Sequence, residues 1–416
     1  MSEIRISPHA LCGSLTPPVS KSDAHRAIIC AALANGTSTV GPITDSADIT
    51  ATVRCLSALG ARIERIGDSL RITGGQPVAA AVCDCGESGS TLRFLLPVAA
   101  ALGVEGHFIG QGRLPARPID VLLEQLALHG VTADREKLPL TLHGRLRSGT
   151  YTLPGDISSQ YITGLLLALP LLQQPARIRL TTPLQSSGYV DMTIATLARF
   201  GVQIGVCADG YEIPAGCGYT PCDYRIEGDW SSAAFPIAAA AIGGDITLHG
   251  LDAASHQGDK AVIDLFQKMG ADITHSGNAY RIRHGLLCGI SVDASEIPDM
   301  VPALAAAAAF AKGETLIHSA GRLRIKESDR LTAVANALRA VGIRVEEGAD
   351  YLRIHGGTPV GGRIDGVNDH RIVMAFSVLA AYASGETVIT DGQAVAKSYP
   401  SFFDDFKKLG GICDVL

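Results

Sequence analysis

The sequence predicts an α/β protein of two domains, each built from three repeats of about 70 residues. Three observations lead to this prediction: a glycine that recurs at nearly constant spacing, an amphipathic helical pattern before each of these glycines, and an alternating strand pattern after it. The 416 residues allow two or three domains, and six repeats of this size are too many for one hydrophobic core.

The repeated glycines are separated by 70, 71, 69, 72 and 68 residues, and they are Gly60, Gly130, Gly201, Gly270, Gly342 and Gly410. Before each of them apolar residues recur three or four positions apart, as Val262, Phe266 and Met269 do. This spacing predicts an amphipathic helix. The glycine stands where such a helix needs a left-handed C-terminal cap, and the alternation in 343–345 is typical of a strand that follows.

Two further features recur in the repeats. An alanine-rich segment about midway, such as 303–311, predicts a second helix in each unit. A second strand follows the first in five repeats, as at Leu70–Thr73, but the sixth repeat stops at Leu416 without one. Because Ile4–Ser7 has the same pattern, we expect this N-terminal strand to complete the last repeat.

Counting three repeats in each half places one domain at residues 1–14 plus 229–416 and the other at 15–228. The chain then crosses between the domains twice, near 13–20 and near Gly228. Such a double crossover predicts a hinge, and we expect the active site in the cleft between the domains. A rigid repeat scaffold without chemistry is the alternative.

The composition excludes several classes of protein. With 47% hydrophobic and 18% charged residues the chain is unlike disordered sequences. Its longest apolar runs, 94–104 and 301–311, are too short for a membrane span and contain prolines. Because 35 basic residues face 41 acidic ones, a net charge of −6, nucleic-acid binding is not expected. The start, MSEIRISPHALCG, lacks a signal-peptide pattern, and we expect a cytoplasmic protein.

Ten cysteines are scattered along the chain, and the closest pair, Cys83 and Cys85, lacks the spacing of a CxxC motif. In a reducing cytosol we expect them to be small buried hydrophobic residues, and we assign no metal site.

Charged or polar motifs stand at predicted helix starts in the first half, where packing does not require them. They are SKSDAHR at 20–26, GESGSTLR at 86–93, RLPARP at 113–118 and SSQ at 158–160. A helix N-terminus with nearby cations is suited to bind anions. Taken singly, each motif is also explained by helix capping or a glycine turn, and capping is the favoured interpretation of SSQ.

The second half carries RIKESDR at 324–330, NDHR at 368–371, AKSYP at 396–400 and an aspartate, Asp299, in EIPD. Lys326 and Arg330 are four residues apart and can share one helix face, with Glu327 between them. A surface salt-bridge network is the alternative for this group, and Asp299 alone could be a helix cap.

Together the two halves offer a set of cations suited to anionic ligands: Lys21, Arg26, Arg93 and Arg117 from one, Lys326, Arg330, Arg371 and Lys397 from the other. Guanidinium groups bind carboxylate and phosphate through paired hydrogen bonds, which predicts two small substrates with several negative charges. Asp299 and Glu327 are the candidate acid and base residues. The expected chemistry is therefore proton transfer with electrostatic stabilisation.

Six repeats carrying these motifs in this order resemble the enolpyruvylshikimate-phosphate synthases over essentially the whole chain. The resemblance implies a two-domain inside-out α/β barrel of the enolpyruvyl transferase type. It implies transfer of the enolpyruvyl (1-carboxyvinyl) group of phosphoenolpyruvate to the 5-hydroxyl of shikimate 3-phosphate, with release of phosphate, on the route to chorismate and the aromatic amino acids. It implies no cofactor, no protein partner, a monomer, and glyphosate as an inhibitor.

The resemblance also assigns roles to residues of this chain. The residues implied to bind shikimate 3-phosphate are Lys21, Ser22, Arg26, Ser158, Ser159, Gln160, Ser186, Asp299 and Lys326. Those implied to bind phosphoenolpyruvate are Lys21, Gly89, Arg117, Gln160, Arg330, Arg371 and Lys397. Asp299, Glu327, Lys21 and Lys326 are implied to be catalytic, and Asp299 matches the residue that orients and deprotonates the 5-hydroxyl.

Three departures from the pattern of the family concern four positions. Glu87 stands where many members have asparagine, Arg322 where some have asparagine, and Ser187-Gly188 where a Lys-Pro pair is found. An acid at position 87 needs a cationic partner or must point away from an anionic substrate.

Two other functions remain as alternatives. The UDP-N-acetylglucosamine enolpyruvyl transferases share the fold and the donor, but they usually carry a reactive cysteine in the loop that here spans 110–117 and has none. A non-catalytic module that binds small anions is the alternative from another class.

Overall fold

The computed structural model describes residues 2–416, which form two compact units. Unit 1 contains the chain up to Ser20 together with Glu227–Leu416, and unit 2 is Lys21–Ile226. The two connections between the units therefore lie at Ser20–Lys21 and at Ile226–Glu227. Each unit is described by itself below.

Residues 2–416 form six four-stranded sheets, three in each unit, and all six have the same topology. In each sheet the first two strands are parallel, and the remaining two continue the sheet with antiparallel pairing. In the three sheets whose strands are consecutive along the chain, a helix lies between the parallel strands and a second helix precedes the antiparallel pair, so these repeats read βαβαββ. The predicted fold class, a two-domain α/β protein of six helix-strand repeats, is confirmed.

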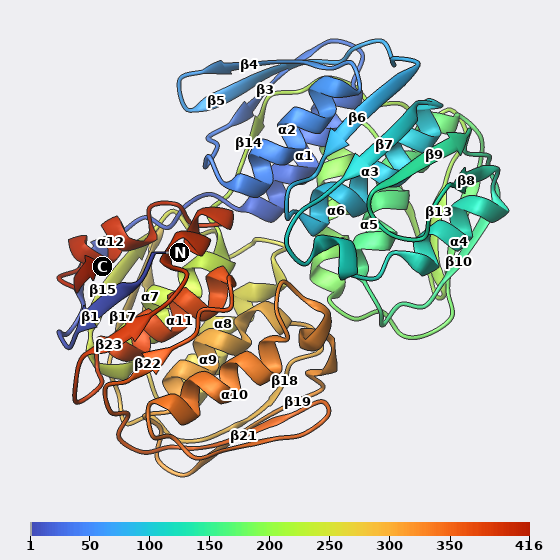
Figure 1. Ribbon diagram of the computed structural model, residues 1–416. Helices are drawn as coiled ribbons and strands as arrows, with labels where there is room; N and C mark the ends of the chain where they lie inside the picture. The colour runs from blue at the N-terminus through green and yellow to red at the C-terminus, as the bar shows by residue number, and fades with distance from the viewer. Residues whose placement is uncertain (1) are drawn as a thin grey trace. The chain divides into compact units, whose positions relative to one another are not determined.

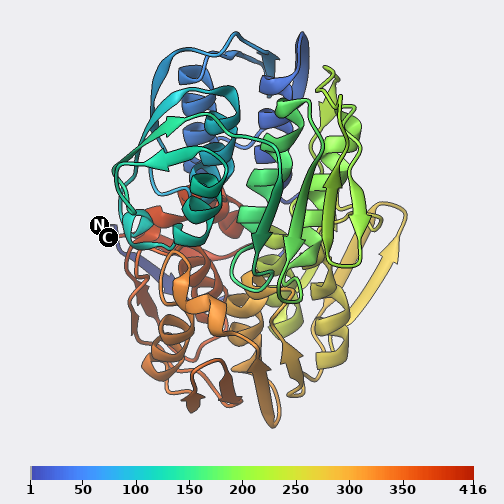
Figure 2. The same cartoon turned by 90° about the vertical axis from the view of Figure 1, so that its right-hand side faces the viewer.

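Unit 2 contains three of these repeats. Its elements are α1 (Lys21–Leu33), β3 (Thr37–Gly41), α2 (Ala47–Ala58), β4 (Arg62–Ile66), β5 (Ser69–Thr73), β6 (Ala80–Asp84), α3 (Gly89–Leu102), β7 (Glu105–Ile109), η1 (Leu114–Ala116), α4 (Asp120–Leu128), β8 (Val131–Ala133), β9 (Leu140–Gly144), β10 (Thr150–Leu153), α5 (Ser159–Ala168), η2 (Leu169–Leu172), β11 (Ala176–Leu180), α6 (Ser187–Arg199), β12 (Gly205–Cys207), β13 (Gly210–Ile213) and β14 (Tyr224–Arg225). Figure 2 shows the strands of this unit at its outside, teal on one side and light green on the other, with helices between them.

Unit 1 contains the other three repeats. Its elements are β1 (Ile4–Ser7), β2 (Cys12–Leu15), α7 (Trp230–Gly243), β15 (Asp245–His249), η3 (Gly258–Ala261), α8 (Val262–Met269), β16 (Asp272–Ser276), β17 (Ala279–Arg283), β18 (Ser291–Asp293), η4 (Pro298–Met300), α9 (Val301–Ala308), β19 (Glu314–His318), η5 (Gly321–Ile325), α10 (Arg330–Ala340), β20 (Val345–Glu347), β21 (Leu352–His355), β22 (Arg363–Ile364), α11 (His370–Ala380), β23 (Thr387–Ile389), η6 (Gly392–Lys397), α12 (Phe402–Lys408) and β24 (Ile412–Val415).

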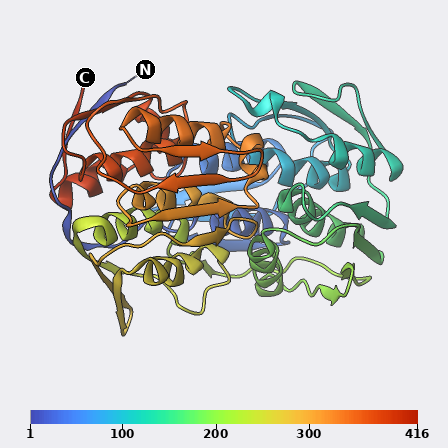
Figure 3. The ribbon, with the colours of Figure 1, turned by 90° about the horizontal axis from the view of Figure 1, so that it is seen from below.

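The alanine-rich helices form the core of unit 1. In α7, α9 and α11 the residues 230–241, 301–308 and 370–380 are all buried. These helices lie side by side in Figure 1, and in Figure 3 the orange strands of the β18-β19-β21-β20 sheet lie across the helices from outside. Small alanine side chains let the helix axes approach closely, so this core is made of helices and the sheets cover it.

The outer helices are amphipathic, and each is followed by one of the periodic glycines. In α8 only Val262, Phe266 and Met269 are buried, the three residues that the spacing places on one face. All six periodic glycines have a positive φ, from 81° at Gly342 to 112° at Gly60. The prediction of left-handed caps is therefore confirmed, and residues with a Cβ would be strained at these positions.

The two connections supply the edge strands of two sheets. Strand β2 comes before α1 in the chain, yet it pairs in parallel with β15 of unit 1. Strand β14 comes before α7, yet it pairs in parallel with β3 of unit 2. The chain thus exchanges the first strands of two repeats. The N-terminal strand β1 lies between β23 and β24 and fills the fourth position of the last sheet.

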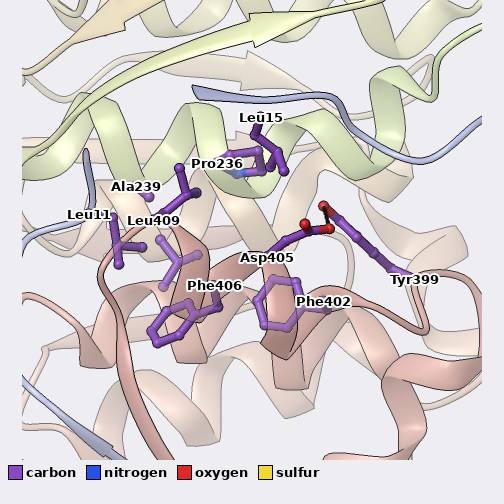
Figure 4. Close-up of a pocket in the computed structure, with 10 residues that line it drawn as sticks. Leu11, Leu15, Pro236, Ala239, Tyr399, Phe402, Asp405, Phe406 and Leu409 are labelled. Carbon is purple, nitrogen blue, oxygen red and sulfur yellow. Dashed lines mark hydrogen bonds between the residues drawn. The ribbon is translucent and has the colours of Figure 1, made fainter. Parts of the chain in front are cut away.

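Helix α12 covers an apolar pocket in unit 1, shown in Figure 4. Leu11 and Leu15 reach this pocket from the N-terminal segment, Pro236 lines it from α7, and Phe402 and Phe406 line it from α12. A hydrogen bond of 3.0 Å from the Tyr399 hydroxyl to Asp405 closes one side. The N-terminal segment is therefore anchored to the last helix by apolar contacts.

Helices α3 and α5 of unit 2 pack closely against each other. Pro97 inside α3 has no N–H to donate to the carbonyl of Arg93. This carbonyl lies against Gly164 of α5, where a Cβ would collide with it. Glycine at position 164 therefore permits the two helices to meet.

The expectation that the cysteines are buried is only half correct. Cys30, Cys55, Cys83, Cys85 and Cys413 are buried, but Cys12 and Cys288 are exposed and the other three are partly exposed. Of the two exposed cysteines, Cys12 begins β2 and Cys288 lies in the segment before β18. Within residues 2–416 no helix has the length and apolar character needed to cross a membrane.

Candidate active-site clusters

The N-terminus of α1 carries the cations of SKSDAHR. Lys21 begins the helix and pairs with Asp48 at a distance of 2.8 Å, with both side chains largely covered. Arg26, one turn later, is buried and donates to the Thr193 hydroxyl at 2.8 Å and to the carbonyls of Ser22 at 2.6 Å and Tyr189 at 2.9 Å. Burial lowers the pKa of Arg26 to about 10, which leaves the guanidinium charged. Arg26 therefore fixes α1 against α6.

The N-terminus of α3 is built from GESGSTLR. The Ser88 hydroxyl caps it by accepting a hydrogen bond from the N–H of Thr91. Gly89 is the first helical residue, and the guanidinium groups of Arg93 and Arg117 lie directly beside it. A Cβ at position 89 would be 2.5 Å from Nη1 of Arg117 and 2.6 Å from Nη1 of Arg93. The missing side chain is what allows two cations to approach this helix N-terminus.

The starts of α5 and α6 bring the SSQ motif and Ser186. Ser158 caps α5, Ser159 is buried at its first position, and the buried Ser186 precedes α6 with a positive φ of 58°. The Gln160 amide donates to the Ser90 hydroxyl at 3.0 Å, and its carbonyl accepts from Arg93 at 3.1 Å. Gln160 thus joins the N-termini of α5 and α3.

A buried chain of hydroxyl groups joins α1, α2 and α3 behind these cations. Nδ1 of His25 lies 2.8 Å from the Thr52 hydroxyl, Thr52 lies 2.7 Å from Thr91, and Thr91 lies 2.8 Å from Ser88. Burial, together with Lys21 and Arg26, holds the pKa of His25 well below its usual value. His25 is therefore neutral and orders the motif rather than adding charge to it.

Unit 1 gathers a second cluster around Arg330, which begins α10. Its side chain is 1% exposed and meets three carboxylates: Asp369 at 2.8 Å, Asp299 at 2.7 Å and Glu327 at 2.6 Å. Burial opposes its charge, but the three carboxylates raise the pKa of Arg330 above its usual value. These carboxylates accept four hydrogen bonds from its guanidinium.

Asp299 lies just before α9, and cations surround its carboxylate. Oδ1 accepts from Arg330 at 2.7 Å and lies 3.7 Å from Nζ of Lys326, and Oδ2 accepts from Arg371 at 3.2 Å. Burial raises the pKa of Asp299, but Arg371, Lys326 and Arg330 outweigh it and hold the pKa well below its usual value. Asp299 is therefore ionised at neutral pH.

Lys326 and Lys397 flank this cluster. Burial lowers the pKa of Lys326 to about 8, opposed by the Asp299 carboxylate and assisted by the charges of Arg322 and Arg330. Lys397 donates to the carbonyl of Asn368 at 2.6 Å. That carbonyl follows a backbone turn in which Val367 and Asn368 both have positive φ, 46° and 51°, an unfavourable conformation for a β-branched valine.

The structure shows where the residues that depart from the family pattern lie. The Glu87 carboxylate packs against Gly112, where an added Cβ would be 2.6 Å from its Cδ. The carboxyl group of Glu87 is therefore directed to the 110–117 loop. Arg322 lies near enough to Lys326 to disfavour its charge. Ser187-Gly188 forms the first turn of α6.

The predicted residues thus form two clusters, one in each unit. Unit 2 gathers Lys21, Ser22, Arg26, Gly89, Arg93, Arg117, Ser158, Ser159, Gln160 and Ser186 at or near helix starts, and unit 1 gathers Asp299, Lys326, Glu327, Arg330, Arg371 and Lys397. In both units the clusters lie at the N-terminal ends of helices, where the helix dipole favours the binding of anions.

Three residues of these clusters were not singled out from the sequence: Asp48, Ser231 and Asp259. A fourth, Asp369, was named only as a member of the NDHR motif and was given no role. Asp369 caps α11 and accepts from both Arg330 and the N–H of Arg371. An aspartate directly before an apolar helix was the available signal, but capping explains it fully. Among residues 2–416, no group of three or more His, Cys, Asp or Glu side chains is placed to hold a metal ion.

Comparison with known proteins gives consistent results over the full chain. The family model described as EPSP synthase (3-phosphoshikimate 1-carboxyvinyltransferase) matches residues 6–406. The chain is 42% identical to the 3-phosphoshikimate 1-carboxyvinyltransferase of Clostridium kluyveri, over 100% of this chain and 99% of that protein, and 42% identical to that of Clostridium novyi with the same coverage.

Solved structures agree with this result. The EPSP synthase of Acinetobacter baumannii matches with a TM-score of 0.84 and 28% identity, and each chain is covered completely. The enolpyruvyl transferase NikO of Streptomyces tendae matches with a TM-score of 0.81 over 100% of this chain and 99% of that one. At 19% identity, the second match is evidence of a shared fold alone.

Proposed function

The chain belongs to the EPSP synthase family, and from that premise we propose that it transfers the enolpyruvyl group of phosphoenolpyruvate to the 5-hydroxyl of shikimate 3-phosphate and releases phosphate. The observation that carries the proposal on the structural side is the Asp299 carboxylate, which is held between Arg330, Arg371 and Lys326. A fixed, ionised carboxylate can accept a hydrogen bond from an attacking hydroxyl and orient it.

Lys326 and Glu327 are the proposed partners of Asp299 in proton transfer. Because the pKa of Asp299 is held well below its usual value, this residue is a poor proton donor at neutral pH. The pKa of Lys326, at about 8, is close to neutrality, which suits a group that gives and regains a proton. We assign protonation of the methylene carbon to the Lys326–Glu327 pair, and the orientation of the 5-hydroxyl to Asp299.

The remaining assignments follow the two clusters. The proposed contacts of phosphoenolpyruvate are Lys21, Gly89, Arg117, Gln160, Arg330, Arg371 and Lys397. The proposed contacts of shikimate 3-phosphate are Lys21, Ser22, Arg26, Ser158, Ser159, Gln160, Ser186, Asp299 and Lys326. Cationic side chains and helix N-termini in both sets support the binding of phosphate and carboxylate groups.

We also propose, from the sequence, that the two clusters act on one pair of substrates held between the units, with the chain as a monomer in the cytoplasm and no cofactor. Domain closure on ligand binding then reduces the radius of gyration in small-angle scattering. Saturation with both substrates and unchanged dimensions would contradict closure. Glyphosate is a proposed inhibitor.

The decisive experiment measures phosphate release from phosphoenolpyruvate with shikimate 3-phosphate or UDP-N-acetylglucosamine as the acceptor, with each substrate alone as a control. Release only with shikimate 3-phosphate supports the proposal. Release only with the nucleotide sugar would assign the chain to the other enolpyruvyl transfer reaction. If no phosphate is released with either acceptor, but phosphoenolpyruvate and shikimate 3-phosphate both bind, the result would favour a non-catalytic module that binds small anions.

Two variants separate catalysis from binding. Asp299→Asn and Glu327→Gln keep the size of each side chain and remove its charge. We expect both to bind shikimate 3-phosphate in calorimetry and to lose most of their turnover. Unchanged turnover in both variants would refute the roles assigned to these carboxylates.

A further inference from the structure

A second layer of side chains stands behind Arg371. The Arg371 guanidinium is buried and donates through Nη1 to the carbonyl of Asp299 at 3.1 Å and through Nη2 to its carboxylate at 3.2 Å. The same Nη2 also donates to the hydroxyl of Ser231 at 2.8 Å. Ser231 belongs to the first turn of α7, and Asp299 lies just before α9. Nη2 of Arg371, a residue of α11, therefore links the starts of all three core helices.

The Ser231 hydroxyl continues to a buried carboxylate. It donates to Oδ2 of Asp259 at 2.6 Å, and Asp259 is 3% exposed. The direction of this chain is fixed by the chemistry of its ends, because a guanidinium can only donate and an ionised carboxylate can only accept. The serine therefore accepts from Arg371 and gives its single proton to Asp259.

The segment directly before Asp259 is held in place as well. The Gln257 amide donates to the carbonyl of Gly228 at 2.8 Å and to Glu227 at 2.9 Å, and its carbonyl accepts from the N–H of Trp230 at 3.0 Å. Segment 257–259 is thereby attached to the start of α7, which also carries Ser231. Asp259 and Ser231 consequently hold a constant position relative to each other.

The buried negative charge of Asp259 opposes folding at neutral pH. Burial and the nearby Asp299 carboxylate raise its pKa to about 6, and Arg371 and Ser231 offset this rise only in part. An apolar or amide side chain at this position would avoid that cost. A buried carboxylate at a position where it disfavours folding indicates a use in the active site.

We propose that Asp259 is a positioning residue that acts through Ser231 to hold the Arg371 guanidinium in the orientation in which it binds the anionic donor substrate and contacts Asp299. This inference rests on the proposed function for the identity of the donor, phosphoenolpyruvate. Asp259 is separated from the donor by two side chains and takes no part in bond making.

The test compares Asp259→Asn and Ser231→Ala with Ser232→Ala. Ser232 is the matched control, because it is a buried serine in the same helical turn whose hydroxyl donates to Asp229 instead of Asp259. We expect the two test variants to raise KM for phosphoenolpyruvate roughly ten- to hundredfold, the range for losing a hydrogen bond to a charged group. KM for shikimate 3-phosphate should change by less than about twofold, and the control should keep both values.

Two further measurements separate positioning from a general loss of structure. The midpoint of thermal unfolding of Asp259→Asn should equal or exceed that of the parent protein at pH 7.5, because the variant removes a buried charge. The double variant Ser231→Ala/Asp259→Asn should be no worse than the more impaired single one, since the two residues act in series. An unchanged KM for phosphoenolpyruvate in Asp259→Asn overturns the inference, as does an equal rise for both substrates with a lowered midpoint.

Failure of the proposed function would be distinguishable from failure of this inference. If the parent protein releases no phosphate with shikimate 3-phosphate, the function is wrong, and calorimetric titration with phosphoenolpyruvate alone then decides the inference. Weaker binding in Asp259→Asn and Ser231→Ala, but not in Ser232→Ala, supports it. Equal binding in all variants, or none in the parent protein, refutes it.

Discussion

Arg330 and Asp369 form an ion pair that is withdrawn from solvent on both sides. Their side chains are 1% and 0% exposed, and Nε of the arginine lies 2.8 Å from Oδ2 of the aspartate. The pair joins the starts of α10 and α11, and the same aspartate caps α11. Burial raises the pKa of Asp369, but Arg330 and the neighbouring His370 outweigh it and keep the pKa below its usual value.

Replacement of Asp369 by asparagine should therefore destabilise the protein strongly. The variant keeps the size of the side chain and a capping oxygen, but it removes the charge opposite a buried guanidinium. We expect the free energy of unfolding to fall by about 3 kcal/mol, the lower end for breaking a buried pair, because Asp299 and Glu327 still contact Arg330. Urea denaturation followed by circular dichroism measures the change.

A surface pair in the same unit provides the control. Arg281 and Asp245 lie 2.7 Å apart with side chains 53% and 40% exposed. Because water and salt screen such a pair, Asp245→Asn should leave the denaturation curve almost unchanged. Equal losses in the two variants would mean that the Arg330–Asp369 pair has no special importance for stability.

Gly89→Ala tests how the cations at α3 are placed. The added methyl group would lie 2.5 Å from Nη1 of Arg117, so the guanidinium has to move away from the helix N-terminus. We expect KM for phosphoenolpyruvate to rise roughly ten- to hundredfold. The fold should not suffer, since alanine is the better helix former.

Gly218→Ala is the matched control for that substitution. Position 218 is exposed in the same unit, and the nearest atom to an added Cβ is 3.8 Å away. Its kinetic constants should equal those of the parent protein. If Gly89→Ala also keeps its KM for phosphoenolpyruvate, Arg117 is not part of the donor site.

Gly164→Ala tests the contact between α3 and α5. A Cβ at this position would collide with the carbonyl of Arg93. Separating the two helices should lower the free energy of unfolding by about 1–3 kcal/mol, as overpacking of a core does. Denaturation in urea gives the value, and a stability equal to that of Gly218→Ala would show that the helices can adjust without cost.

The repeats could be predicted from the sequence because their signals are local. A glycine after an amphipathic pattern indicates a left-handed cap whatever surrounds it, and the periodic glycines do have positive φ. The exchange of the edge strands β2 and β14 was not predicted strand by strand. Cys12–Leu15 (CGSL) shows no alternation, and Tyr224–Arg225 is too short to show any. The pairing of these strands with β15 and β3 depends on the tertiary fold.

The charged residues of the site were also visible in the sequence, since helix starts do not need so many cations for packing. Ser231 and Asp259 were not, because each resembles an ordinary polar residue at a helix start. Their importance arises from a contact between residues 140 positions apart, which joins Ser231 to Arg371. Only the folded chain shows that this serine lies between an arginine and a buried carboxylate.

Lys326 gives the clearest prediction of a pH dependence. Its pKa is lowered to about 8 by burial, so the ammonium group loses its charge as the pH rises through 8. If the charge is needed for binding and proton transfer, kcat/KM should fall about tenfold per pH unit above that value. The unfolded chain keeps this proton up to about pH 10.5, so the contribution of Lys326 to stability rises with pH between 8 and 10.5 while activity falls.

Lys326→Arg distinguishes this group from others that titrate at alkaline pH. Arginine stays charged throughout the range but does not give up a proton, so the maximum of kcat/KM should fall strongly and the residual activity should no longer decline near pH 8. Lys312→Arg, at an exposed position in the same unit, should retain the fall near pH 8. A profile of Lys326→Arg that still breaks at pH 8 would assign the alkaline limb to a different residue and remove the evidence that Lys326 supplies the proton.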